Sequence, residues 1–406
     1  MGDGVNGARP ALAGVRILDF SSLLAGPISP LFLGMLGAEV IKVESRVRLE
    51  GMRRPPYAYD DPEQSPVYNS LNLNKLCVQL NLKEPAALEL ALRLVSVSDA
   101  VVENMRPGVM DRMGLGYDRL RQANPTIVMI SGSSAGRHGP ESSYPGYANV
   151  FNSLSGLGHL TGYPDAPPSE LRDSIDARVG ATSAFAVLTG LFHRRRTGEG
   201  GFIDLSASEA LAMFGGEALM EYAMNGRVQH RRGNREPGMA PHGCYRCQGD
   251  DTWVTIAVEN DTEWRALCRA VGREDWASDP RFADRLLRCR NQDALDEFLE
   301  GWTAKHTPEE AVRILQDAGV AAAPSMSSQD LAEDPHLRYR GVWQEIEHPV
   351  LGAQTVQAAP WKLSETPPTI RSAGPLIGQH NHHVFVELLG APPEDVARWQ
   401  EAGVIN

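Results

Sequence analysis

Short apolar runs alternate with longer amphipathic segments along residues 1–130. The runs are rich in Val, Ile and Leu and predict buried strands. They lie at 15–20, 38–43, 100–103 and 126–130. The segments at 28–36 and 83–95 have the apolar spacing of helices. Because strands that alternate with helices form mostly parallel sheets, the pattern predicts an α/β fold.

The pattern changes in the second half of the chain. A small-residue-rich segment at 181–195 predicts a buried helix, and Gly, Pro, Arg and His become frequent at 227–243. Beyond this point, a strand and several helices predict a smaller α+β unit. We therefore expect three segments, with the bounds 1–225, 226–328 and 329–406.

Composition and charge restrict the class of protein. A formal net charge of −12 argues against a nucleic-acid-binding surface, although a compact anionic ligand needs only a local basic cluster. Five scattered cysteines favour reduced thiols, and the N-terminus lacks the features of a signal peptide. Cys244 and Cys247 have no matching pair of further zinc ligands. We expect a cytoplasmic protein with no membrane span and no metal site.

Basic residues gather in and after the predicted strands, where parallel sheets bind their ligands. Their charged groups could hold phosphates, although a solvated surface explains most of them equally well. The candidates are Lys42, Arg46, Arg48, Arg53, Arg54, Lys75, Arg106 and Arg112.

Residues 132–136 match the Gly-x-Ser-x-Gly pattern of a serine hydrolase, with Ser134 as the nucleophile. Such a serine must lead directly into a helix, and the Gly- and Pro-containing residues 137–145 disfavour one. A loop that lines a ligand site is favoured, with the hydrolase as the alternative from a different class.

Asp173 and Asp176 precede the apolar helix. Either carboxylate could cap the helix by accepting hydrogen bonds from its free backbone N–H groups. The same helix N-terminus stabilises an ionised carboxylate, which could then act as a nucleophile at neutral pH. The residues alone favour the cap and leave both roles open.

Several segments together resemble the family III CoA-transferases, the group that includes formyl-CoA, carnitine and benzylsuccinate CoA-transferases. The most specific segments are 37–44, 102–108, 111–114 and 196–200, and the similarity runs from Leu12 to Ile405. The resemblance implies that Asp176 attacks an acyl-CoA thioester, forms an aspartyl anhydride and then an aspartyl-CoA thioester, and passes CoA to an acceptor acid. Asp173 has no matched role.

The resemblance also implies the architecture and the partners. A large Rossmann-like domain would be built from both ends of the chain, with the small α+β domain between them. Two chains would form an interlinked dimer, with an identical partner expected and a heteromer possible. Coenzyme A and acyl-CoA would be substrates, and no permanently bound cofactor is implied.

The resemblance assigns seven positions to CoA binding. They are Leu24 and Ala25 in the channel, Asn104 and Met105 at the pantetheine arm, Arg112 and Met113 near the nucleotide, and Arg46 as a phosphate partner.

Two departures from the family bear on the substrate and the site, and a third position bears on the reaction. Members that handle very small polar acids carry Gln where this chain has Leu24, so we expect a larger or more apolar acyl group. The glycine loop of formyl-CoA transferase is matched only loosely by 233–243. The related α-methylacyl-CoA racemases carry a catalytic His where this chain has Tyr147. Because a phenol ionises only at about pH 10, the racemase is the weaker alternative. Transferases of the family have a tyrosine near the active site at this position, so the resemblance implies that place for Tyr147, which could otherwise be an aromatic packing residue.

Overall fold

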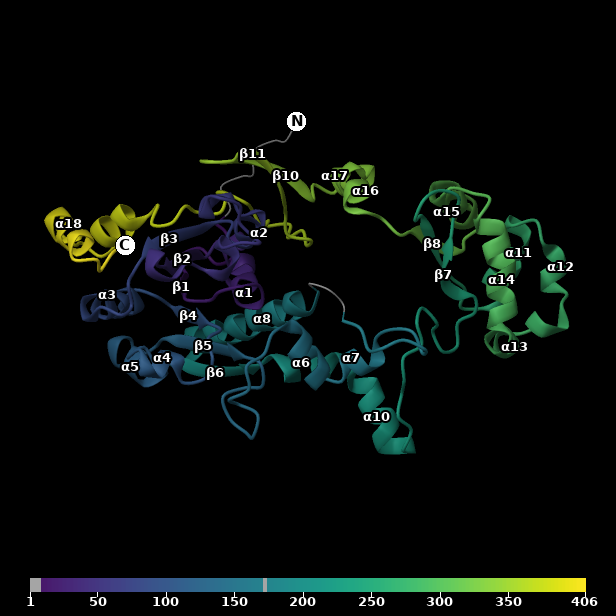
Figure 1. The fold of residues 1–406 in the computed structure, drawn as a ribbon, viewed down its shortest axis with the longest axis horizontal. Coiled ribbons are helices and arrows are strands. Elements are labelled where there is room, and N and C mark those ends of the chain that lie inside the picture. The colour runs from purple at the N-terminus through teal and green to yellow at the C-terminus, as the bar shows by residue number, and fades with distance from the viewer. Residues whose placement is uncertain (1–8, 171–173) are drawn as a thin grey trace. The chain divides into compact units, whose positions relative to one another are not determined.

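The computed structural model describes residues 9–170 and 174–406. Contacts divide these residues into two compact units (Figure 1). The sheet unit comprises the described parts of Met1–Gly158, Glu170–Val228 and His336–Asn406. The small unit comprises His159–Ser169 and Gln229–Pro335.

A six-stranded parallel sheet forms the centre of the sheet unit, in the order β3-β2-β1-β4-β5-β6. Its strands are β1 (Arg16–Asp19), β2 (Glu39–Glu44), β3 (Lys75–Gln79), β4 (Ala100–Glu103), β5 (Val128–Ser133) and β6 (Gly201–Ser206). This is the strand order of doubly wound nucleotide-binding folds. The predicted α/β class with a mostly parallel sheet is confirmed.

Both faces of the sheet are buried, which explains why its central strands are continuous apolar runs. Leu18 points to one face, where it packs with α3 (Pro85–Ser96) and with Phe385 of the C-terminal segment. Its neighbour Ile17 points to the other face, where it packs with Leu33 of α1 (Ala25–Met35) and Val187 of α8 (Ser174–Thr197). Successive side chains along a strand therefore point in turn to one hydrophobic layer and then to the other.

The helices of the described residues comprise α-helices, short 3-10 turns and one π-helical segment. Up to residue 225 they are α1 (Ala25–Met35), η1 (Arg46–Arg48), η2 (Gly51–Arg53), η3 (Pro62–Gln64), α2 (Pro66–Leu71), α3 (Pro85–Ser96), α4 (Val109–Arg112), α5 (Tyr117–Ala123), α6 (Ala148–Leu154), α7 (Leu157–Leu160), α8 (Ser174–Thr197), α9 (Ala207–Ala212), η4 (Met213–Gly215) and α10 (Gly216–Asn225). Beyond it they are α11 (Asp261–Ala270), α12 (Glu274–Ala277), η5 (Pro280–Phe282), α13 (Arg285–Arg290), α14 (Gln292–Thr303), α15 (Pro308–Asp317), α16 (Ser328–Glu333), α17 (Pro335–Tyr339), η6 (His383–Leu388) and α18 (Pro393–Glu401).

Helix α8 is the longest element of the sheet unit and packs along α1. The close contact depends on Gly180, because a Cβ there would lie 2.6 Å from Cβ of Ile28. Among the described helices, α8 is long and apolar enough by length and composition to cross a membrane. One face of it, including Val179, Ala184 and Val187, is nevertheless buried within the sheet unit.

The small unit has its own sheet and core. Its antiparallel sheet has the order β7-β8-β9, with β7 (His242–Arg246), β8 (Trp253–Ala257) and β9 (Ala321–Pro324). Helices α11, α14 and α15 contribute Leu267, Leu299 and Leu315 to a single hydrophobic cluster with these strands. A further antiparallel pair, β10 (Trp343–His348) and β11 (Gly352–Gln357), follows in the returning C-terminal segment.

Candidate active site

The strand order of the parallel sheet reverses between β1 and β4. Successive strands run outward from β1 toward β3 on one side and from β4 toward β6 on the other. Doubly wound folds bind their ligands in the crevice at this point, beyond the carboxyl ends of the strands. The segments that leave β1 and β4 here contain Leu24, Ala25, Asn104 and Met105, four of the predicted CoA-binding residues.

Asn104 holds the turn that follows β1. Its Oδ1 accepts a hydrogen bond from Ser22 N at 2.8 Å, and its Nδ2 donates to Ser22 O at 2.9 Å. Gly26 permits this approach, because a Cβ at that position would lie 2.6 Å from Cγ of Asn104. The structure thus brings Asn104 and the Leu24 turn together, with the amide of Asn104 bonded to the backbone.

The next residue of the turn, Leu23, has a φ of 67°, a left-handed conformation that is unfavourable for leucine. Its N–H donates to Oε1 of Glu50 at 2.5 Å. The other oxygen of Glu50 accepts from Met52 N at 2.6 Å at the start of η2. One buried carboxylate therefore joins the turn to the loop after β2.

Three buried charged groups support the turn from the core of the sheet unit. Lys75 Nζ lies 2.9 Å from Oδ2 of Asp19 and donates to Pro27 O, while Lys42 Nζ donates to Ser21 O at 2.8 Å. Burial alone would raise the pKa of Asp19, but the two ammonium groups lower it below its usual value. Burial lowers the pKa of Lys75 to about 8, although Asp19 opposes this shift.

Three of the basic phosphate candidates are excluded by this burial. Lys42 and Lys75 lie inside the sheet unit with Asp19, and Lys75 belongs to β3 rather than to a loop. Arg53 has no exposed side-chain surface and pairs with Glu44 and Glu63. These side chains neutralise carboxylates in the core, so they are not available to hold a phosphate, and the solvated-surface alternative is wrong for them as well.

Arg46 differs, because its side chain is 57% exposed and its nearest carboxylate, Glu63, is 3.9 Å away. It lies in η1 directly after β2, and its backbone N–H donates to Asn406 O. The structure thus leaves its guanidinium accessible at the carboxyl end of the sheet.

Asp176 and Tyr147 occupy helix N-termini in the sheet unit. Asp176 is partly buried in the first turn of α8, and Tyr147 is the 69% exposed residue before α6. Their sequence neighbours Ile175 and Ala148 pack in one hydrophobic cluster with Ala25. This cluster brings the backbone beside Asp176, Tyr147 and Leu24 together, although the three are far apart in sequence. Asp173 lies outside the described residues.

Arg112 and Met113 lie at the end of α4, and Met105 packs on the same side of the sheet as Met110 of that helix. Met105 N donates to Oε2 of Glu103 at 2.7 Å. Burial raises the pKa of Glu103. Arg112 is exposed at the surface of the sheet unit.

Ser134 does not have the setting of a hydrolase nucleophile. Strand β5 ends at Ser133, and the next helix, α6, begins only at Ala148. The Oγ of Ser134 is buried, and a Cβ added to Gly146 would lie 2.2 Å from it. No strand–serine–helix elbow is present in this described segment.

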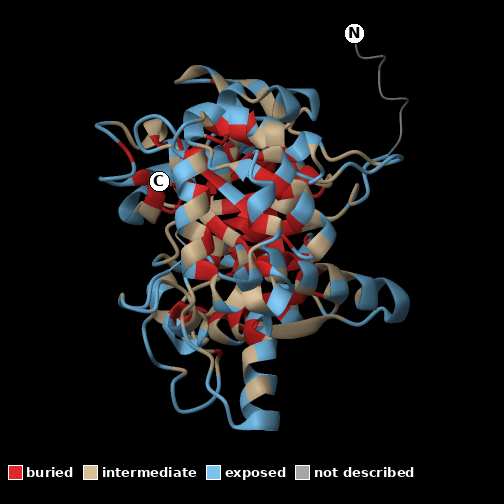
Figure 2. Cartoon of the chain, turned by 90° about the vertical axis from the view of Figure 1, so that its right-hand side faces the viewer, coloured by how far each residue is buried: buried red, intermediate tan, exposed pale blue. Residues whose placement is uncertain are grey.

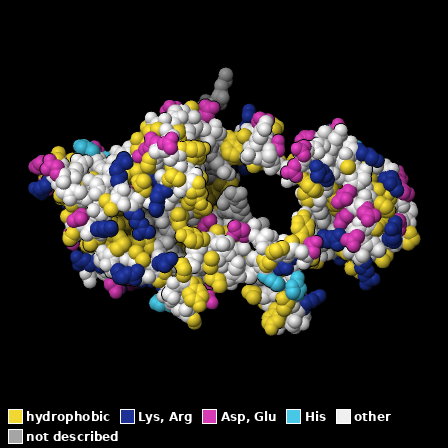
Figure 3. Space-filling model, viewed as in Figure 1, with side chains coloured by type: hydrophobic (Ala, Val, Ile, Leu, Met, Phe, Trp, Pro, Cys, Tyr) yellow, Lys and Arg dark blue, Asp and Glu magenta, His cyan; other side chains and the backbone are white. Residues whose placement is uncertain are grey.

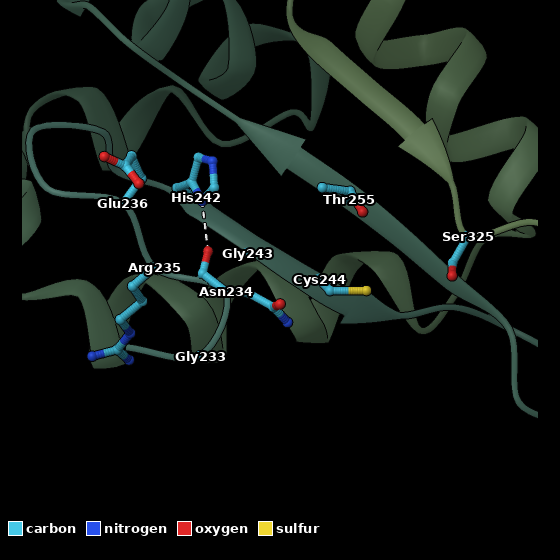
Figure 4. Close-up of a pocket in the computed structure, with 9 residues that line it drawn as sticks. All are labelled: Gly233, Asn234, Arg235, Glu236, His242, Gly243, Cys244, Thr255 and Ser325. Carbon is cyan, nitrogen blue, oxygen red and sulfur yellow. Dashed lines mark hydrogen bonds between the residues drawn. The ribbon is translucent and has the colours of Figure 1, made fainter. Parts of the chain in front are cut away.

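The loosely matched glycine loop lines a pocket of about 480 Å³ in the small unit (Figure 4). His242 Nδ1 lies 2.6 Å from Asn234 O. A dashed line marks this hydrogen bond in Figure 4. Arg235 at the pocket edge pairs with Asp293 and Asp296. Two carboxylates on one guanidinium leave a net negative charge, which disfavours an acid ligand there. Within the described residues, no group of three or more His, Cys, Asp or Glu could hold a metal ion.

The family comparison is decisive for the class of protein. Residues 12–381 match the family described as CoA-transferase family III. The chain belongs to this family. It is 33% identical to the succinyl-CoA–D-citramalate CoA-transferase of Chloroflexus aurantiacus over 96% of this chain and 97% of that protein. It is 33% identical to the acetyl-CoA:oxalate CoA-transferase of Acetobacter aceti over 81% and 84% of the two chains.

A solved CaiB/BaiF family protein from Brucella suis has the same fold. Its TM-score is 0.86 at 28% identity, and the match covers 94% of this chain and 100% of that chain. As a family III CoA-transferase, this chain is an enzyme that transfers CoA between carboxylic acids and uses CoA thioesters as substrates. The family resemblance inferred from the sequence is confirmed.

Proposed function

We propose that this family III CoA-transferase is an acyl-CoA:carboxylate CoA-transferase that uses Asp176 as its covalent nucleophile. The observation that carries the proposal is the place of Asp176 in the first turn of α8, beside the cluster that contains Ala25. The N-terminal end of a long helix stabilises negative charge, which favours an ionised, nucleophilic carboxylate.

The proposed reaction has four balanced steps. An Asp176 oxygen attacks the thioester carbon of the donor, the C–S bond breaks, and CoA leaves as a thiolate. The thiolate attacks the aspartyl carbon of the resulting anhydride and releases the donor acid as a carboxylate. The acceptor carboxylate then attacks the aspartyl carbon of the aspartyl-CoA thioester, whose C–S bond breaks to release the thiolate and leave a second anhydride. The thiolate finally attacks the acyl carbon of this anhydride, and the bond from that carbon to the Asp176 oxygen breaks to give the new acyl-CoA and free Asp176. Each intermediate retains the energy of the thioester, provided that water is excluded.

The seven predicted CoA-binding positions remain part of this proposal. Leu24 and Ala25 would line the CoA channel, and Asn104 and Met105 would contact the pantetheine arm. Arg112 and Met113 would lie near the nucleotide end, and Arg46 would be a phosphate partner. Exposed Arg46 and Arg112 suit phosphate contact, because their guanidinium groups are accessible. Tyr147 would lie beside the reacting groups.

The substrates can be narrowed to a panel. Succinyl-CoA is the first donor to test, because several relatives are named for it. Acceptors should include the named acids of the relatives, namely citramalate, malate, mesaconate and oxalate. Because Leu24 cannot offer a side-chain hydrogen bond, branched and aromatic acids belong in the same panel.

The proposed assembly is a cytoplasmic homodimer of interlinked chains. Large apolar side chains are exposed on α8 and in the segment η4–α10 of the sheet unit, where a second chain would cover them. The alternative is a heteromer, since two relatives from Chloroflexus aurantiacus are named as α and β subunits.

The covalent intermediate is the direct test of the proposed function. The purified enzyme is incubated with each acyl-CoA, treated with hydroxylamine and digested, and the peptide that contains Asp176 is examined by mass spectrometry. We expect a hydroxamate on Asp176, and loss of transfer by at least about 1,000-fold in Asp176→Asn. Full transfer activity in that variant would rule the nucleophile out.

The same samples test the two alternatives. A racemase would incorporate solvent deuterium at the substrate α-carbon in the absence of any acceptor acid. A serine hydrolase would be labelled by a fluorophosphonate at Ser134, which its buried Oγ disfavours.

A further inference from the structure

Glu50 is a buried carboxylate to which neither the proposed mechanism nor the family resemblance gives a role. It is an acidic residue in an otherwise basic loop, between Arg48 and Arg53. Both of its oxygens accept hydrogen bonds from backbone N–H groups, and these groups belong to two separate segments of the sheet unit. One segment is the turn before α1, and the other is the loop after β2.

We propose that Glu50 is a positioning residue that fixes the acyl end of the CoA site relative to its nucleotide end. This inference rests on the proposed function, since it concerns the site that Leu24 and Arg46 would form. The carboxylate holds Leu23 N at 2.5 Å and Met52 N at 2.6 Å. Leu24 follows the first of these residues directly, and Arg46 lies in the same loop as the second.

The turn needs such support because its conformation is unfavourable by itself. Leu23 is left-handed, with a φ of 67°, and a leucine adopts this conformation only where neighbouring groups enforce it. Asn104 fixes Ser22 from the β4 side, but the N–H of Leu23 is held by Glu50. Packing adds to this contact, since a Cβ at Gly51 would lie 2.4 Å from Cδ2 of Leu23.

The two hydrogen bonds that Glu50 accepts require a carboxylate at this position. Each oxygen of Glu50 faces a backbone N–H donor, so an amide in its place would direct its NH₂ group at one of them. Glu50→Gln keeps the size of the side chain but must lose one of the two hydrogen bonds. The turn would then sample other conformations, and Leu24 would no longer hold a fixed place in the CoA channel.

The matched control is Asp61→Asn. Asp61 caps the nearby helix η3 by accepting from Glu63 N at 2.9 Å, as Glu50 caps η2, but it has no hydrogen bond to the turn. With purified full-length enzyme, we would measure kcat and KM for several acyl-CoA donors of different size. Hydrogen exchange of the peptide that covers residues 21–25 would be followed by mass spectrometry.

In Glu50→Gln we expect faster hydrogen exchange at residues 21–25. We also expect the donor ratio, which is the kcat/KM of the best donor divided by that of the poorest donor, to fall tenfold or more. Asp61→Asn should change neither by more than about twofold. A general loss of folding would lower the rates with all donors alike and leave their ratio unchanged, so the ratio separates positioning from stability.

Two failures can be told apart. A wild-type enzyme that transfers CoA from no donor to any acceptor would overturn the proposed function. A wild-type enzyme that transfers CoA, with an unchanged donor ratio in Glu50→Gln, would overturn the inference about Glu50 alone.

Discussion

Arg53 shows how a basic side chain near a ligand site can serve the core instead. Its guanidinium donates to Glu44 at 3.0 Å and to Glu63 at 2.5 Å, and it stacks 3.5 Å from the ring of Tyr68. Tyr68 OH also donates to Glu44 at 2.6 Å. Burial would raise the pKa of Glu44, but Arg53 and Lys42 lower it below its usual value. The carboxylate is therefore charged in the core, and its stability depends on the cation beside it.

Replacing Arg53 with Met should destabilise the protein in a pH-dependent way. At pH 7 the variant buries a charged Glu44 without its main partner, and we expect a loss of about 3–5 kcal/mol in the free energy of unfolding. Wild-type Glu44, with its lowered pKa, stabilises the fold above its unfolded pKa, and this contribution is lost as pH falls through the folded value. In the variant, burial raises the pKa of Glu44, so protonation relieves the penalty at a higher pH. The difference from wild type should shrink at pH 4.

Urea unfolding at pH 7 and pH 4 measures both differences. Arg281→Met is the control, because Arg281 forms an ion pair with Asp279 at the surface and its loss should change unfolding little at either pH. An equal loss at both pH values in Arg53→Met would contradict the role of Glu44.

At the scale of elements, helix α8 links packing to the candidate nucleophile. Gly180 lies one turn after Asp176 and touches α1, since a Cβ there would lie 2.6 Å from Ile28 and 2.9 Å from Ala25 O. Gly190 lies farther along the same helix, where a Cβ would be 2.7 Å from Val128 of the sheet. The two glycines have similar packing but differ in their distance from Asp176, about 21 Å along the axis for Gly190.

Gly180→Ala and Gly190→Ala should therefore separate stability from activity. Each added methyl group forces its neighbours apart, at a cost of about 1–3 kcal/mol in the free energy of unfolding. Only Gly180→Ala should displace the first turn of α8 from α1, and we expect it to lower kcat about tenfold or more. Steady-state transfer and thermal unfolding test both variants, and an equal fall in kcat would contradict the proposed position of Asp176.

The elements that could be predicted from the sequence are those with a continuous apolar pattern. Strands β1, β2, β4 and β5 are buried on both faces, so their apolar runs indicated them. Strands β3 and β6 were missed because polar residues interrupt them, among them Lys75 and Asp204. The start of α8 was missed because Ser174, Asp176 and Arg178 precede its apolar part.

The candidate site divides in a similar way. Asp176 could be identified as a helix-terminal carboxylate, and the family resemblance supplied its proposed role. Lys42 and Lys75 were misjudged because their burial depends on Asp19, which lies 23 and 56 positions away in the chain. Glu50 was overlooked because its partner Leu23 has a left-handed conformation that the sequence pattern does not reveal. Contacts between distant segments are not visible in local periodicity.

At the scale of the whole molecule, the exposed apolar residues call for a covering surface. They include Phe185 and Met213, which are 72% and 78% exposed, and Met224 of α10 at 73%. Helix α10, at the bottom of Figure 1, has no buried residue, and Figure 2 shows its turns as intermediate or exposed. Hydrophobic side chains cover its tip in Figure 3. Large apolar surfaces of this kind mark protein contacts, which agrees with the proposed dimer.

The double variant Met213→Glu/Met224→Glu should weaken that assembly. Two buried charges at a hydrophobic interface disfavour association, whereas the same charges are solvated in a separate chain. Because interlinked chains separate only on unfolding, each protein is unfolded in urea and refolded at low concentration before sedimentation. We expect refolded wild type at about twice the 44.2 kDa of one chain and the variant shifted toward one chain. Leu286→Glu, at a 64% exposed leucine on α13 of the small unit, is the control and should keep the wild-type mass. A wild-type protein that sediments as a single chain would contradict the homodimer, and a variant with unchanged mass would show that these methionines lie outside the interface.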